Sequence, residues 1–166
     1  LSPLDGRYRT KVQPLAEYFS EYALIKKRFT VEVHWLLALA AEPTLRDIPA
    51  IDAQQQKKLL SWVDNFSLQD AIAIKEIEKE TRHDVKAVEY DLVRRCKQEG
   101  LSKHLNFVHV LCTSEDINNL AYALLLQESQ QKVLFPKVAT LLQCLQEQSS
   151  QHAEVAMLGR THGQPA

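Results

Sequence analysis

Residues 114–152 read SEDINNLAYALLLQESQQKVLFPKVATLLQCLQEQSSQH, a run with no Gly and a single Pro. Its apolar residues recur at steps of three and four, the spacing of one helix face: Ile117, Leu120, Ala121, Leu124, Val138, Leu141, Leu142 and Leu145. Pro136 removes one backbone donor and crowds the preceding turn, so we expect it to kink or split the helix. A helix of this length needs neighbours along its apolar face, and few residues follow it. The run therefore predicts an exposed apolar stripe that a helical bundle covers in the intact protein.

The rest of the sequence also favours helix. Only four Gly occur among 166 residues, while Leu, Ala, Glu, Gln and Lys are abundant. Helical periodicity predicts four further helices, at about residues 15–41, 52–63, 68–78 and 84–99. Residues 1–13 are expected to be an irregular entry segment, and residues 101–112 are short and mixed. The predicted fold class is all-α.

Local signals mark several helix ends. Pro14 suits a first helical turn, where its missing N–H is not needed. Ser67 with Asp70 three residues later forms a capping-box pattern. Gly100 is placed to end the helix over residues 84–99.

Charge and cysteine usage exclude several classes of protein. Lys and Arg number 20 against 21 acidic residues, so nucleic acid and anionic membrane surfaces are not expected partners. Cys96, Cys112 and Cys144 are odd in number and widely spaced, which indicates neither a disulfide framework nor a zinc site. This cysteine usage fits a reducing cytoplasm.

Neither a membrane span nor a signal peptide is expected. The longest uncharged apolar stretch, residues 33–41, is less than half of the ~20 residues that a bilayer requires. The chain begins without Met and without a basic-then-apolar leader, so we expect the first natural residues to be missing. At the other end, residues 163–166 are expected to be cut inside a loop.

Three motifs near helix starts combine charge with hydrogen-bonding groups. Arg7 and Tyr8 follow an Asp-Gly turn and could bind a phosphate, although surface residues of a terminus would have the same pattern. His83 and Asp84 begin a helix, where backbone N–H groups favour anions; a structural histidine beside a cap is the alternative. Thr113 and the residues after it also suit an ordinary helix cap, which the residues alone favour.

Two further histidines have different surroundings. His109 lies three residues before Cys112, but no second ligand pair accompanies them, so a metal site is not expected. His162 lies in the polar run Arg-Thr-His-Gly-Gln-Pro, where Gly163 lets the backbone approach a ligand. His162 is the best catalytic candidate on residue chemistry, and an exposed loop histidine without function is the alternative.

In their order, four segments resemble the bacterial adenylosuccinate lyase family of the fumarase and aspartase superfamily. They are Asp-Gly-Arg-Tyr at 5–8, His-Asp-Val-Lys-Ala-Val-Glu at 83–89, Thr-Ser-Glu-Asp-Ile-Asn-Asn at 113–119 and Thr-His-Gly-Gln-Pro-Ala at 161–166. The resemblance covers essentially the whole chain. It implies a homotetramer around a twenty-helix bundle, active sites shared by three subunits, and no cofactor. It also implies an N-terminal helical domain over residues 1–111 and the start of the bundle domain over residues 112–166.

The resemblance also implies roles for individual residues. Arg7 and Tyr8 would contact the substrate phosphate, and His162 would be the catalytic, proton-transferring histidine. The remaining implied substrate contacts are Arg82, His83, Asp84, His109, Thr113, Ser114 and Gln164. The family has Asn where this chain has Arg82, which would either meet a substrate carboxylate or point away and leave the contact to backbone.

The implied reaction is β-elimination of fumarate from adenylosuccinate, and from the succinylated imidazole-carboxamide ribotide of purine synthesis. The family's base is a serine in a Ser-Ser-x-Met-Pro-x-Lys-x-Asn loop, which this sequence lacks, so the fragment alone is expected to be inactive. One alternative is a superfamily relative such as argininosuccinate lyase or fumarase, which the Arg7-Tyr8 pair argues against. Another is a non-catalytic helical scaffold.

Overall fold

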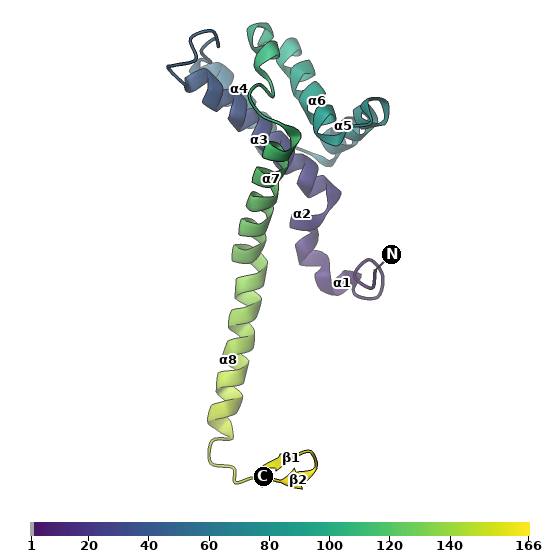
Figure 1. Ribbon diagram of the computed structural model, residues 1–166, viewed down its shortest axis with the longest axis vertical. Helices are drawn as coiled ribbons and strands as arrows, with labels where there is room; N and C mark the ends of the chain where they lie inside the picture. Colours follow the sequence, from purple (N-terminus) through teal and green to yellow (C-terminus); the bar gives the residue numbers. More distant parts are fainter. Residues whose placement is uncertain (1) are drawn as a thin grey trace. The chain divides into compact units, whose positions relative to one another are not determined.

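The computed structural model describes residues 2–166, and almost all of its regular structure is helical (Figure 1). Contacts divide the chain into two compact units, one ending at Ser129 and the other spanning Gln130–Ala166. The predicted all-α class is confirmed, with one short hairpin as the exception.

The first unit contains these elements in order: α1 (Arg9–Val12), η1 (Gln13–Leu15), α2 (Ala16–Phe19), α3 (Glu21–Ala41), α4 (Ala53–Asp64), α5 (Leu68–Thr81), α6 (Asp84–Gln98), η2 (Ser102–Phe107) and α7 (Ser114–Ser129). The second contains a π-helical turn η3 (Gln130–Leu134), α8 (Phe135–Gln151), β1 (Arg160–Thr161) and β2 (Gln164–Pro165). The helices predicted at residues 52–63, 68–78 and 84–99 are confirmed as α4, α5 and α6.

Side-chain caps explain where these helices begin and end. Ser67 and Asp70 form the predicted capping box, in which each side chain accepts a hydrogen bond from the other residue's backbone N–H. Asp52 and Gln55 form a second box at the start of α4. Gly100 follows α6 with a φ of +77°, a left-handed conformation that glycine adopts without steric cost.

The prediction of one continuous helix over residues 15–41 is wrong at Ser20. This residue is extended (ψ 160°), and its hydroxyl accepts the backbone N–H of Ala23 at 3.2 Å, so it ends α2 and caps α3. The entry segment is also more regular than expected. Lys11 and Val12 both donate backbone N–H groups to the carbonyl of Tyr8, which closes the single turn of α1.

The core of the first unit surrounds α3. Phe29, Val33 and Leu36 on this helix are completely buried, and α3 contacts α4, α5, α6 and α7. α5 and α6 lie side by side, both teal in Figure 1. A smaller apolar cluster joins α3, α6 and α7 through Val31, Val85 and Ile117. Helix α3 is therefore the central support of this unit.

The apolar residues of α7 and α8 differ in burial. On α7, Ile117, Ala121 and Leu125 are buried, whereas Leu120 is 55% exposed. On α8 no residue is buried. The large apolar residues of α8 are 52–60% exposed, and they are Phe135, Val138, Leu141, Leu142 and Leu145. The expected exposed stripe is confirmed on α8 and only partly on α7.

Pro136 lies in the first turn of α8, directly after the π-helical turn. An α-helix would require its backbone N–H for the carbonyl of Lys132, and proline has none. The wider turn interrupts the regular hydrogen-bond pattern at this point. The expected kink or split therefore takes the form of a π-helical turn, and the backbone remains helical from this turn into α8.

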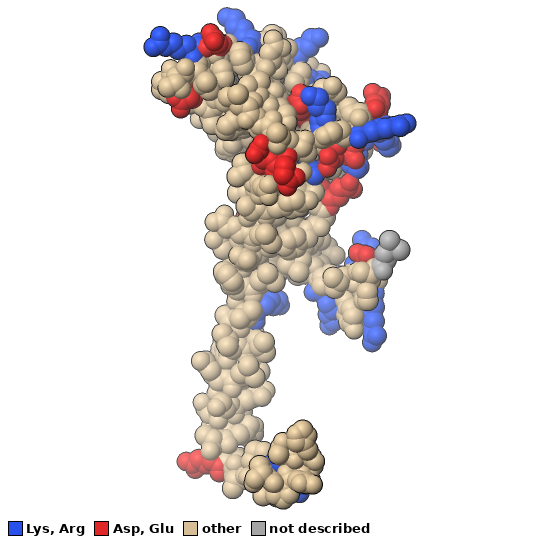
Figure 2. Space-filling model, in the orientation of Figure 1, with Lys and Arg blue, Asp and Glu red and all other residues tan. Residues whose placement is uncertain are grey.

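Charged side chains of both signs are interspersed on the first unit, and the drawn face of α8 is largely uncharged (Figure 2). None of the helices within residues 2–166 combines the length and apolar character needed to cross a membrane.

Candidate functional site

Two charged side chains lie on the buried face of α3. Arg28 is 6% exposed and Glu32 is fully buried, one helical turn further along. A buried charge is costly unless it is paired and hydrogen-bonded. Arg28, Glu32 and the side chains that pair with them therefore form a polar centre within the first unit.

Arg28 connects the starts of α6 and α7. Its Nη2 lies 2.6 Å from Asp84 Oδ2, and its Nε donates to Asn118 Oδ1 at 2.8 Å. Partial burial alone would raise the pKa of Asp84. A hydrogen bond from the backbone N–H of Val85 and the Arg28 charge oppose this effect and lower the pKa below its ordinary value. Asp84 is therefore held as a carboxylate at neutral pH.

His83 caps α6 and faces α7. Its Nδ1 accepts the backbone N–H of Lys86 at 3.2 Å, and its Nε2 lies 3.5 Å from Ser114 Oγ. In the neutral ring this arrangement places the proton on Nε2, on the side of Ser114. Two helix N-termini meet here, and their free N–H groups and dipoles favour an anionic ligand.

Thr113 pairs with Asp116 at the start of α7, as its sequence pattern predicts. Its backbone N–H and its hydroxyl both donate to Asp116 Oδ2, at 2.7 and 2.9 Å. These bonds, the backbone one foremost, lower the pKa of Asp116. The Thr113 hydroxyl is thus engaged within the helix start.

His109 pairs with the buried acid on α3. Its Nδ1 lies 2.6 Å from Glu32 Oε1, and Cys112 Sγ donates to the His109 carbonyl at 3.3 Å. Burial raises the pKa of Glu32, and the His109 ring acts in the opposite direction. Burial also raises the pKa of Cys112 to about 11, so this cysteine is a thiol at neutral pH.

The loop before α7 has an unusual backbone. His109 and Leu111 both have a φ of 62°, in the left-handed region that non-glycine residues rarely adopt. Trp35 Nε1 on α3 donates to the carbonyl of Val110 between them, at 2.7 Å. The indole bond and the Glu32 pair hold this loop against α3.

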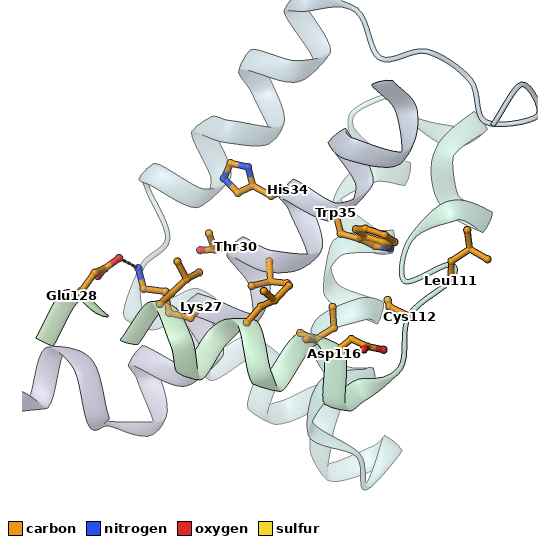
Figure 3. Close-up of a pocket in the computed structure, with 12 residues that line it drawn as sticks. Lys27, Thr30, His34, Trp35, Leu111, Cys112, Asp116 and Glu128 are labelled. Atoms are coloured by element: carbon orange, nitrogen blue, oxygen red, sulfur yellow. Dashed lines mark hydrogen bonds and ion pairs between the residues drawn. The ribbon is translucent and has the colours of Figure 1, made fainter. Parts of the chain in front are cut away.

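A cavity of about 710 Å³ lies between α3 and α7 (Figure 3). Trp35, Leu111 and Cys112 lie near one end, and an ion pair of Lys27 with Glu128 lies near the other. Apolar side chains form much of its wall. His83, Asp84 and Ser114 are not among its lining residues, so the cavity does not include these three side chains.

Arg7 and Tyr8 lie in the entry segment before α1. Both are exposed, and the Arg7 guanidinium lies 5.4 Å from the centre of the Tyr8 ring. Among residues 2–166, Arg7 forms no ion pair, so its charge is available to an anionic ligand.

Arg82 is an exposed C-cap of α5. Its φ of 52° is left-handed, and its backbone N–H donates to the carbonyl of Glu78 at 2.7 Å. Asn tolerates this conformation better than other non-glycine residues.

The second unit contains His162 and Gln164. β1 and β2 pair antiparallel, with Thr161 opposite Gln164, and the turn residues His162 and Gly163 have φ values of 50° and 78°. Two positive φ values are typical of a two-residue type I′ hairpin turn. The expected loop is therefore a short hairpin with an exposed histidine at its tip.

Comparison with known proteins adds a family to this geometry. A family model described as a lyase matches residues 6–166. The chain belongs to this lyase family.

Similar proteins named adenylosuccinate lyase occur in several bacteria. The lyase chain is 47% identical to that of Legionella pneumophila (strain Corby), 46% to that of Haemophilus influenzae and 44% to that of Escherichia coli (strain K12). Each match covers 100% of this chain and 37% of the relative. The chain thus spans just over a third of the length of these relatives.

Sequence reasoning missed two residues of this lyase chain, Arg28 and Glu32. The available signal was their position, since α3 periodicity places Glu32 within a turn of Phe29 and Leu36, where an apolar residue is expected. Among the residues that the structure describes, no three His, Cys, Asp or Glu side chains are arranged to hold a metal ion.

Proposed function

We propose that the full-length protein is an adenylosuccinate lyase, a carbon–nitrogen lyase that eliminates fumarate from adenylosuccinate to give AMP. The same chemistry applies to the succinylated imidazole-carboxamide ribotide of purine synthesis. The main support is the identity of 44–47% to proteins of that name over the whole chain. The polar centre at the starts of α6 and α7 agrees with an anionic substrate.

The substrate's negative groups divide among several residues in this proposal. Arg7 and Tyr8 bind the phosphate, because a guanidinium forms charge-assisted bonds to phosphate oxygens. The remaining contacts line the succinyl and base portions, and they are Arg82, His83, Asp84, His109, Thr113, Ser114 and Gln164. No cofactor takes part.

The elimination needs a base, stabilisation of a carbanion and an acid. A proton leaves the carbon beside a succinyl carboxylate, the carbon–nitrogen bond breaks, and the leaving nitrogen is protonated. We assign the acid to His162, whose imidazole can donate a proton near neutral pH. The serine-loop signature implied by the family is absent from these 166 residues, so the fragment alone is inactive in this proposal.

The proposed assembly is a cytoplasmic homotetramer with active sites shared between subunits. The exposed apolar residues of α8 support it, because large apolar surfaces usually meet a partner. In this arrangement residues 1–111 are an N-terminal helical domain, and residues 112–166 begin the bundle domain.

Fumarate release by the full-length protein tests the substrate. Adenylosuccinate should be cleaved and argininosuccinate should not; the reverse preference would assign a different superfamily activity. A folded protein that releases fumarate from neither would favour the non-catalytic scaffold.

His162→Gln tests the assigned acid. A positioned proton donor typically contributes ~10²–10⁴-fold, so kcat should fall by about that factor while substrate still binds. The exposed turn residue has little part in the core, and circular dichroism should therefore be unchanged. Wild-type kcat in the folded variant would transfer the acid role to His83 or His109.

A further inference from the structure

Two acidic side chains of the first unit are completely buried, and they differ in how they are satisfied. Asp91 pairs with Arg94 through one carboxylate oxygen and with Arg95 through the other. Glu32 pairs only through Oε1, with His109, and its Oε2 has no hydrogen-bond partner within residues 2–166. An unpaired buried carboxylate oxygen is costly for folding. A contribution to folding stability therefore accounts well for a buried acid at Asp91 and poorly for one at Glu32.

The residue that Glu32 contacts has a costly conformation of its own. His109 has a φ of 62°, and such backbone conformations persist only where the surroundings enforce them. Here the enforcing contacts are the Trp35 indole on the next carbonyl and the Cys112 thiol on the His109 carbonyl. The unpaired oxygen of Glu32 and the left-handed backbone of His109 thus occur in two residues that contact each other. The His109 side chain is 17% exposed.

We propose that Glu32 is a positioning residue for His109. Its carboxylate accepts a hydrogen bond from the Nδ1–H, which fixes the orientation and tautomer of the ring and leaves Nε2 to meet the substrate. This inference rests on the proposed function, in which His109 contacts the succinylated nucleotide. A carboxylate behind an imidazole orients histidines in the same way at other protein sites.

Other charges near the pair come from α6 and α7. Lys86 and Glu89 on α6 act on Glu32 with opposite signs, and Asp116 on α7 is close enough to be affected by His109. Lys86 and Glu89 also pair with each other at 2.9 Å. The direct bond at 2.6 Å therefore makes Glu32 the principal partner of the ring.

Steady-state kinetics of the full-length enzyme test the proposal. Glu32→Gln keeps the shape and removes the charge, and by analogy with carboxylates behind ligand histidines, kcat/KM should fall roughly 10–100-fold. The loss should lie in KM, because an incorrectly oriented contact weakens substrate binding. A purely structural defect would reduce the fraction of active enzyme, lowering apparent kcat while KM stays unchanged.

A double mutant shows whether Glu32 acts through His109. If it does, Glu32→Gln combined with His109→Gln should be no worse than His109→Gln alone. Asp91→Asn is the matched control, since it also alters a fully buried acid. Its effect on kcat/KM should multiply with the effect of His109→Gln. If Glu32→Gln does not fold, Glu32→Met removes the buried polar group as well as the charge and should give the same rise in KM.

The outcomes separate this inference from the proposed function. An active wild-type enzyme with unchanged KM in folded Glu32 variants would overturn the inference alone. Multiplicative losses in the double mutant would overturn it as well. Full-length wild-type protein that eliminates fumarate from no succinylated nucleotide would overturn the proposed function, and the positioning role with it.

Discussion

Replacing Arg28 should destabilise the first unit more than removing an exposed ion pair does. Arg28→Met keeps an unbranched side chain but removes the bonds to Asp84 and Asn118, at 2.6 and 2.8 Å. Hydrogen bonds to charged groups contribute about 1.5–3 kcal/mol each. The Asp84 side chain is 47% exposed, so water recovers part of its bond, and the expected loss is about 2–3 kcal/mol.

Urea denaturation followed by tryptophan fluorescence measures this loss, because Trp35 and Trp62 both lie in the first unit. Lys58→Met is the matched control. Its ion pair with Glu99, at 3.1 Å, joins two side chains that are 46% and 44% exposed. Removing it should change the free energy of unfolding by less than about 1 kcal/mol.

The effect of Arg28→Met should also depend on pH. The pKa of Asp84 is lowered in the folded protein. Its pair with Arg28 therefore stabilises the folded protein fully at pH values above 3.8, the ordinary pKa of this side chain. The part of this stabilisation that comes from Asp84 disappears as the pH falls through the folded value, whereas the bond to Asn118 does not titrate. The difference between wild type and variant should therefore shrink in acid. Equal losses for Arg28→Met and Lys58→Met, or a difference that does not shrink below both pKa values, would refute the reasoning.

Three further predictions concern other parts of the molecule. In the full-length enzyme, Arg7→Ala should weaken the binding of AMP roughly tenfold or more, measured by calorimetry, and leave the binding of fumarate nearly unaffected. Equal weakening of both ligands would mean that Arg7 acts through the fold. Arg82→Asn should raise the free energy of unfolding of the 166-residue chain by up to about 1 kcal/mol, because Asn tolerates a positive φ; a decrease would reveal a stabilising role of the Arg82 side chain. Light scattering should give a tetramer for the full-length protein, and a well-behaved monomer would contradict the shared sites.

Most helix boundaries could be predicted because their causes are local. Ser67 and Asp70 satisfy each other across three residues, and Gly100 needs only its own backbone freedom. The break at Ser20 was missed because apolar residues continue at helical spacing on both sides of it. A single hydroxyl that bonds three residues ahead decides that boundary, and periodicity does not reveal it.

The candidate site was less predictable because its contacts are distant in sequence. Arg28 bonds Asn118, 90 residues away, and Glu32 bonds His109, 77 residues away. A charged residue in a helix is usually solvated, so the charge of Glu32 outweighed its position on the apolar face, and nothing local indicated the partner of either residue. Motifs indicated His83 and Ser114, and the family resemblance indicated His109, whereas only the packed structure shows what supports them.

The spacing of Arg28, Glu32 and Trp35 also constrains how the length of this sequence can vary. Steps of four and three place the three residues on one face of α3, over about 10.5 Å at 1.5 Å per residue. An inserted or deleted residue between 28 and 35 would turn the remaining helix by about 100° and misplace at least one of the three attachments. Homologous chains should therefore show no length changes in this interval. In the loop that follows α3, residues 42–48 form backbone hydrogen bonds only with near neighbours, and this part should accept insertions readily.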